Sequence, residues 1–201
     1  MLRLGFLALA GFAILAAPVV AKPLPAPTAS YSATATYTIG KDHYTSTVFA
    51  NGANERRVVD TELGPQIVII KRNEGKAYLL QPAIGALEMP LSSKEIGVDV
   101  GQLFTTTARP AGTETISGLK TTKYRLTAQP ATNTKFTGTV WATDDGIIVK
   151  VDGTGSYRGQ PTHVAMALSD VKRGDQPVSS FELPRDTRII PAGPLVKQLL
   201  E

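Results

Sequence analysis

Residues 31–52, which read YSATATYTIGKDHYTSTVFANG, decide the fold of this chain. Within them, Tyr31–Ile39 alternates apolar and polar side chains at every second position, which is typical of a strand with one buried face. Gly40–Asp42 predicts a turn, and His43–Ala50 predicts a strand that runs back beside the first. Asn51-Gly52 predicts a hairpin turn, because both residues tolerate positive φ. The stretch therefore predicts consecutive antiparallel strands.

The same pattern continues along the rest of the chain. About a quarter of the 201 residues are Thr, Val or Ile, whose branched side chains lose rotamer freedom on a helix and favour strands. Further strands are predicted at Glu55–Asp60, Gln66–Arg72, Lys76–Gln81, Thr113–Ile116, Lys123–Gln129, Lys135–Thr143, Ile147–Asp152 and Thr162–Val171. Short turns join them and no helix alternates with strands, so we predict a mainly-β protein with one antiparallel sheet of about ten strands.

One stretch between the strands has a different character. Ser92 and Glu95 have the spacing of a capping box, in which each side chain satisfies a backbone N–H at the start of a helix. The apolar residues that follow, as far as Phe104, then share one helical face. Gly97 and Gly101 oppose a helix, because glycine is a poor helix former. We predict a short helical insert here.

The two ends of the chain differ from its centre. Residues 1–21 place one positive residue before an apolar run of about 14 residues and end in Val-Val-Ala, which predicts a cleavable signal peptide. A membrane anchor is the alternative, although the run is shorter than the roughly 20 residues that span a bilayer. Residues 22–30 predict a Pro- and Ala-rich linker, 31–190 the folded domain, and 191–201 a tail with a short helix.

Residues that would carry catalysis or bind a metal are scarce. The chain has no Cys, and His43 and His163 lie far apart in the sequence without ligand spacing. Gly153–Gly159 lacks the spacing of a nucleotide-binding loop, and Asp144-Asp145 precedes a glycine in a hairpin turn. A serine-hydrolase G-x-S-x-G motif is missing as well. We predict a protein that is not an enzyme and that has no catalytic residues, metal or cofactor.

The chain is basic, with a net charge of +4 and a pI near 9.3. Only 6% of its residues are aromatic and no motif that reads DNA or RNA is present, so nucleic acid is not a predicted partner. The basic pairs along the chain favour either an anionic membrane surface or an acidic envelope partner. A solvated charged face is the alternative interpretation.

Three apolar runs are continuous rather than alternating. Ile67–Ile70, Tyr78–Leu80 and Gly146–Val149 have apolar side chains on both faces of a strand. One face would pack on a neighbouring layer. The other would either belong to an ordinary core or line a concave apolar cavity.

Three motifs support a resemblance to a known family. Gly118–Arg125 (GLKTTKYR) resembles a G-x-x-x-x-K-Y strand entry, and Gly138–Ile147 (GTVWATDDGI) resembles a G-x-V-W-x-T-x-D-G-I hairpin. Phe181–Pro184 (FELP) resembles a closing F-x-[IL]-P segment. Together they resemble a bacterial exported domain family of unknown function, which is related in fold to the LolA, LolB and RseB group.

The resemblance implies a half-open antiparallel β-barrel whose apolar concave side is covered by a short helical lid. It implies an exported, periplasmic, monomeric protein that holds an acyl chain, lipid or lipoprotein there. The alternative is a periplasmic protein-interaction or sensor module with a filled core, closer to RseB. The residues expected to form the wall and lid of the cavity are Val68, Ile70, Leu80, Phe104, Tyr124, Trp141, Val149 and Met166.

Overall fold

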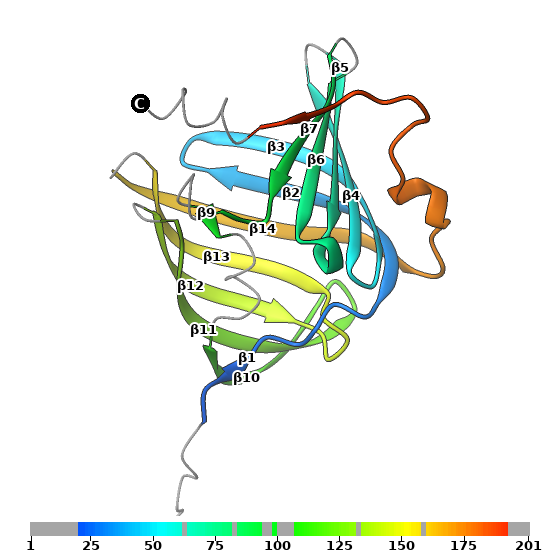
Figure 1. The fold of residues 1–201 in the computed structure, drawn as a ribbon. Helices are drawn as coiled ribbons and strands as arrows, with labels where there is room; N and C mark the ends of the chain where they lie inside the picture. Colours follow the sequence, from blue (N-terminus) through cyan, green and yellow to red (C-terminus); the bar gives the residue numbers. More distant parts are fainter. Residues whose placement is uncertain are drawn as a thin grey trace, which may run out of the picture.

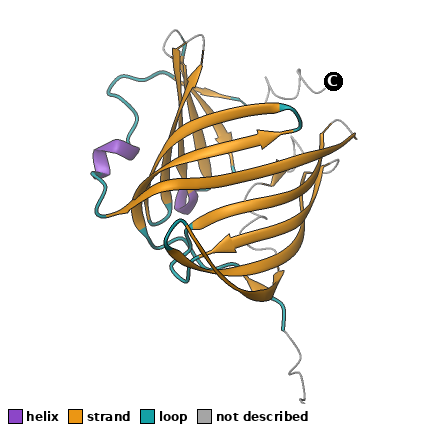
Figure 2. Ribbon diagram, turned by 180° about the vertical axis from the view of Figure 1, so that it is seen from behind, coloured by secondary structure: helices purple, strands orange, loops and turns teal. Residues whose placement is uncertain are grey.

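A computed structural model describes residues 20–61, 64–81, 84–93, 98–99, 107–131, 134–157 and 160–192. These residues form one sheet of 15 strands, which curves around a concave face (Figures 1 and 2). The strands are β1 (Lys22–Pro23), β2 (Ser30–Ile39), β3 (Asp42–Asn51), β4 (Asn54–Thr61), β5 (Gly64–Lys71), β6 (Lys76–Gln81), β7 (Gly85–Pro90), β8 (Ser92–Ser93), β9 (Val98–Asp99), β10 (Thr107–Ile116), β11 (Leu119–Ala131), β12 (Thr134–Ala142), β13 (Ile148–Tyr157), β14 (Gln160–Arg173) and β15 (Ile189–Pro191). The 3-10 helices are η1 (Arg72–Glu74) and η2 (Val178–Phe181).

The sheet consists of two meanders that meet at its centre. Strands β2 to β7 pair in chain order, as do β10 to β14, and β14 then pairs antiparallel with β2. The two ends of this order are β1 beside β10 and β15 beside β7, and no pairing among the described strands joins β7 to β10. The mainly-β, half-open antiparallel barrel is therefore confirmed. Among the described strands, only β15 runs parallel to its neighbour.

All ten predicted strands are present, but one of them, β10, is longer than predicted, and β1, β7, β8, β9 and β15 were not predicted. Strand β10 begins at Thr107 rather than Thr113, because Pro110 and Gly112 resemble a loop in the sequence. Its register with β11 shifts between Pro110 and Thr113, and a proline is tolerated there because β10 lies near the edge of the sheet. Strand β7, which begins at Gly85 and ends at Pro90, was missed for the same reason.

The predicted helical insert has a different structure where the chain is described. Ser92–Ser93 and Val98–Asp99 pair as the short antiparallel strands β8 and β9, and β9 also pairs with the end of β11. A helix that starts at Ser92 is therefore wrong, which agrees with the low helix propensity of the glycines in this stretch. The remainder of the insert, including Phe104, lies outside the described residues, as does the predicted C-terminal helix.

Two of the three continuous apolar runs, Ile67–Ile70 and Tyr78–Leu80, lie in β5 and β6, whose convex face is covered by another part of the chain. After β14 the chain crosses the convex face of these strands before it reaches β15 (Figures 1 and 2). Phe181 of η2 is 2% exposed and packs with Ile69 and Tyr78 on that face. Arg56 Nη1 donates a hydrogen bond of 3.2 Å to the carbonyl oxygen of Ser180. The crossing segment is thus the outer layer that these strands require.

Residues 22–30, the predicted linker, are extended but packed. Lys22 and Pro23 form β1, and Leu24 is 8% exposed within a core cluster. The backbone N–H groups of Thr28 and Ala29 donate to the carbonyl oxygen of Asp145 at 3.0 and 3.2 Å. The segment therefore holds the β12–β13 hairpin against the sheet. Residues 1–19 lie outside the described part of the chain, and no helix within that part is long and apolar enough to cross a lipid bilayer.

Candidate functional site

The concave face of the sheet encloses a cavity of about 1120 Å³. Both meanders contribute side chains to its wall, so the cavity lies across the junction of β14 and β2. Most of the lining is aliphatic or aromatic, and it includes Val48, Val68, Ile70, Leu126, Phe136 and Met166. A volume of this size is slightly above the roughly 300–1,000 Å³ that small-molecule pockets occupy.

A compact charged cluster interrupts this apolar wall. The carboxylate of Glu55 accepts hydrogen bonds from two guanidinium groups: Arg57 Nε donates to Oε1, and Arg72 Nη2 donates to Oε2 at 2.6 Å. Arg57 Nη1 also donates to the hydroxyl of Tyr37, and its guanidinium lies 5.5 Å from the centre of the Tyr37 ring. All four residues line the cavity.

The alternation of β4 explains why charged side chains enter the cavity. Glu55 and Arg57 are two residues apart and therefore face the concave side, whereas Arg56 between them faces the convex side and bonds the crossing segment. Arg57 pairs with Val48 on β3 and with Val68 on β5, so its aliphatic stem lies between two apolar strands.

The protonation states of the cluster follow from its contacts. Burial alone would raise the pKa of Glu55, which is 5% exposed, but the charges of Arg57 and Arg72 outweigh burial and hold the pKa below its ordinary value. Burial, reinforced by the charge of Glu55, raises the pKa of the Tyr31 hydroxyl, which lies beside the cluster. At neutral pH the cluster thus holds one carboxylate, two guanidinium groups and a neutral tyrosine, which amounts to one net positive charge.

Three of the predicted wall residues line the cavity. Val68 and Ile70 occupy alternate positions of β5 on the concave face, and Met166 of β14 lines the same cavity. Their role in ligand binding stays a prediction, as does that of Phe104, which is not among the described residues.

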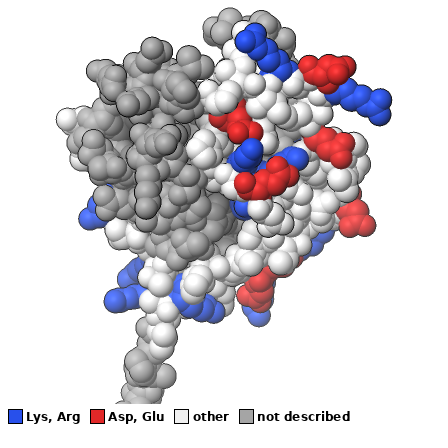
Figure 3. Space-filling view, viewed as in Figure 1, with Lys and Arg blue, Asp and Glu red and all other residues white. Residues whose placement is uncertain are grey.

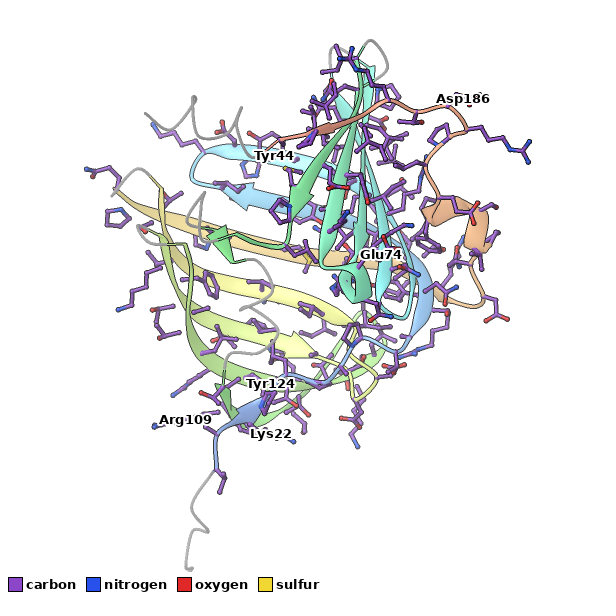
Figure 4. The ribbon with its side chains drawn as sticks, viewed as in Figure 1. Lys22, Tyr44, Glu74, Arg109, Tyr124 and Asp186 are labelled. Atoms are coloured by element: carbon purple, nitrogen blue, oxygen red, sulfur yellow. The ribbon has the colours of Figure 1, made fainter. Side chains whose placement is uncertain are left out.

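Four other predicted wall residues lie elsewhere. Leu80 pairs with Ile67 on the convex face of β6, where it packs against the cluster of Phe181. Tyr124 and Val149 are 2% and 0% exposed, and they pack inside core clusters that also contain lining residues, Tyr124 near β1 (Figure 4). Leu80 is outside the cavity because a shift of one residue moves a side chain to the other face, whereas Tyr124 and Val149 are outside it because neighbouring side chains cover them.

Trp141 is buried on the convex face, although the prediction placed it in the wall. Its indole Nε1 donates to Glu114 Oε2 at 2.7 Å, and the ammonium groups of Lys123 and Lys150 lie 5.1 and 4.7 Å from its ring. These neighbours shield the ring on the outer surface, so it is only 6% exposed without entering the cavity. Trp141 is therefore not among the residues that line the cavity in the structure.

The charged cluster was missed in the sequence analysis, although a signal for it exists. Asn54–Asp60 reads NERRVVD, so charged side chains occupy neighbouring positions of one strand. Successive residues point to opposite faces, and one face of β4 is concave. At least one of these charged residues must therefore face the interior of the half-barrel.

The other titratable groups show no comparable arrangement. His43 contacts Thr38 at 3.1 Å and His163 contacts Asp152 at 3.4 Å, and both histidines are exposed. No group of three His, Cys, Asp or Glu side chains in the described part could hold a metal ion.

In the view of Figure 3, basic side chains gather near the end where β1 leaves the sheet. Lys22 and Arg109, which are labelled in Figure 4, lie at this end.

Comparisons with known proteins give only distant structural matches. No protein-family model matches the chain, and no curated protein matches it. One similar solved structure is the Pseudomonas aeruginosa MucA/MucB complex, with a TM-score of 0.49, 13% identity, and coverage of 82% of this chain and 59% of that chain. A second is MucB in complex with MucA(peri), with a TM-score of 0.47, 13% identity, and coverage of 82% and 57%.

A third similar structure is a DUF1329 family protein from Desulfovibrio piger, with a TM-score of 0.41, 10% identity, and coverage of 78% of this chain and 90% of that chain. This chain spans less than two thirds of the matched chains in the MucB structures. Likeness of this degree does not transfer a function. The half-open barrel rests on the strand pairing itself, and membership of the LolA, LolB and RseB group stays a prediction.

Proposed function

We propose that this protein is an exported, non-catalytic carrier that shelters the acyl chain of a lipid or lipoprotein in its concave cavity. The cavity of about 1120 Å³ carries this proposal. Protein interiors are close-packed and rarely contain voids much larger than a water molecule, so a space of this size is not a packing defect. An apolar chain in it would gain roughly 0.8 kcal/mol for each methylene group removed from water.

The packing around the cavity supports this proposal. Ile147 and Val149 are 0% exposed, and they belong to the core cluster that contains the lining residue Leu168. The core is therefore well filled next to a large space. A protein with a filled half-barrel would instead bury large side chains across the whole concave face.

Native mass spectrometry tests the proposal directly. The full chain, secreted into a bacterial periplasm and purified from it, is expected to carry a bound mass that denaturation releases and that lipid analysis identifies as acyl-bearing. Its N-terminus is expected at Lys22, which tests the signal peptide at the same time. A protein free of bound mass, both as purified and after incubation with phospholipid, would contradict the carrier.

Matched variants connect the bound mass to the cavity. Val68→Glu places a charge on the apolar wall and is expected to remove most of the bound lipid. Val178→Glu makes the same change at a residue that is 66% exposed on η2, and it is expected to leave lipid binding unchanged. Circular dichroism confirms that both variants fold. Equal lipid content in the two variants would place the lipid outside the cavity.

A second candidate function is docking of a partner protein at the β10 edge of the sheet. Only Thr107 and Ala108 of β10 pair with β1, and no other strand in the described ranges pairs with that outer edge. An extended segment of a partner could add to such an edge. MucB, one of the similar structures, is solved in complex with MucA. This function would make the protein an envelope interaction module.

Site-specific photocrosslinking in living cells tests the docking function. A photoreactive residue at Thr113, which is exposed on β10, is expected to crosslink to one envelope protein. The same residue at Thr36, which is exposed on the central strand β2, serves as the control. Identical crosslinking patterns at the two positions would contradict a specific β10 interface.

A further inference from the structure

We propose that Arg57 binds the head group of the ligand in the cavity and that the ligand is an amphiphile with an anionic head group. This inference rests on the proposed carrier function and specifies its ligand. Nothing in an apolar chain requires charge in the wall, yet the wall contains an ordered charged cluster. The cluster therefore indicates a polar end on the ligand.

The charge count of the cluster indicates the sign of that end. Glu55 uses one carboxylate oxygen for Arg57 and the other for Arg72, so Arg57 shares its carboxylate with a second guanidinium group. A guanidinium in an apolar wall that is only partly neutralised favours a further anion beside it. A monoanionic head group would supply Arg57 with that second counter-charge.

The hydrogen bonds of Arg57 show where the head group would bind. A guanidinium has five N–H donors, and Arg57 uses one for Glu55 and one for Tyr37 among the described residues. Its side chain is 32% exposed, and it lines the cavity. The remaining donors are therefore available to a ligand, and a guanidinium binds carboxylate and phosphate groups with matching bidentate geometry.

The position of Arg57 also suits an amphiphile. Its neighbours across the concave face are Val48 and Val68, and Ile70 lies opposite Glu55. A head group on Arg57 would place the first carbon atoms of a chain directly against these apolar side chains. Tyr37 packs against the guanidinium and fixes its plane. The guanidinium that would bind the head group is thus adjacent to the apolar side chains that would contact the chain of the ligand.

A comparison of three ligands with the same chain tests this inference. Hexadecanoate, hexadecyl phosphate and uncharged hexadecanol are bound to the full chain at neutral pH, and their affinities are measured by displacement of the neutral probe N-phenylnaphthylamine. Both anions are expected to bind about tenfold or more tightly than the alcohol. The tighter of the two anions distinguishes a fatty acid from a lipid phosphate as the source of the head group.

Matched variants then assign the preference to Arg57. Arg57→Gln leaves Glu55 and Arg72 as a balanced pair, so the fold is expected to persist while the preference for anions falls below about threefold. Arg57→Lys keeps the charge and is expected to retain most of the preference. Arg56→Gln removes the same charge from the convex face of the same strand and is expected to change neither affinity.

The outcomes separate the two proposals. If the wild-type protein binds all three ligands equally, or if Arg57→Gln retains the full preference, the head-group site is overturned while the carrier function stands. If no ligand displaces the probe, the carrier function fails, and the head-group site fails with it. A preference that disappears in Arg57→Gln and persists in Arg56→Gln supports the site.

Discussion

Substitution of Glu55 by Gln tests the charge balance of the cavity through stability. The carboxylate is 5% exposed and bridges Arg57 and Arg72, so its removal leaves two guanidinium groups without their shared counter-charge. Breaking a buried ion pair from one side costs about 3–5 kcal/mol. We expect about 3 kcal/mol here, at the lower end, because the Arg57 side chain is 32% exposed to the cavity.

Urea unfolding at neutral pH measures this loss. Glu74→Gln is the matched control, because Glu74 also forms an ion pair, with Lys71 at 3.1 Å, but its side chain is 51% exposed. We expect the control to lose less than about 0.5 kcal/mol, as is usual for exposed pairs. If Glu55→Gln lost no more stability than Glu74→Gln, the cluster would not be the balanced unit inferred from its geometry.

The pH dependence of stability gives an independent check on Glu55. Burial would raise its pKa, but Arg57 and Arg72 outweigh burial and lower the pKa from the ordinary value of 4.5. The folded protein therefore binds this proton more weakly than the unfolded chain does. Glu55 stabilises the fold above pH 4.5, and its contribution disappears as the pH falls through the lowered pKa. Thermal unfolding should show the wild-type advantage over Glu55→Gln shrinking on acidification, and a constant advantage would contradict it.

Three further predictions concern the packing and the two faces of the sheet. Phe181→Ala should lose about 3–5 kcal/mol in urea unfolding, since the ring is 2% exposed between the crossing segment and the sheet. Val178→Ala, at 66% exposure, should change less than about 0.5 kcal/mol. Gly118→Ala should lower the free energy of unfolding by about 1–2 kcal/mol, because of its positive φ alone. Gly146→Ala should lower it by about 1–3 kcal/mol more, because its Cβ would stand 2.2 Å from a backbone oxygen of the N-terminal segment. Equal losses in the two variants would contradict this close approach. Trp141 is the single tryptophan and lies on the convex face, so its emission wavelength should stay constant when hexadecanoate fills the cavity, and a shift would return Trp141 to the wall.

The sheet was predictable because its signals are local. The alternation of Tyr31–Ile39 and the turn signal of Asn51-Gly52 each depend on neighbouring residues only, and both agree with the pairing of β2 with β3. The register of β14 with β2 is not local. It joins residues more than a hundred positions apart, and nothing in either strand's own pattern specifies its partner.

The wall of the cavity was harder to predict, for a reason that β5 and β6 illustrate. A continuous apolar run indicates that both faces of a strand are apolar, but it does not indicate which of the two faces is on the concave side of the sheet. The hairpin settles this, because Val68 and Leu79 pair on one face while Ile67 and Leu80 pair on the other. Val68 therefore reaches the cavity and Leu80 does not, although the two are equally apolar. Only the curvature of the complete sheet distinguishes them.

The side chains of β2, at the junction of the two meanders, connect the packed core to the cavity. The concave face of β2 carries Ala33 and Ala35 between Tyr31 and Tyr37, and Ala50 faces the cavity from β3. Ala33 and Ala35 are 5% and 0% exposed inside a core cluster, so neighbouring side chains pack closely over them and the cavity lies beside this packed region. The two tyrosines at the ends of this row instead flank the charged cluster with their hydroxyl groups. Strand β2 thus contributes two cavity-lining tyrosines next to the charged cluster, so a ligand that fills the cavity would lie with its head group within reach of Arg57.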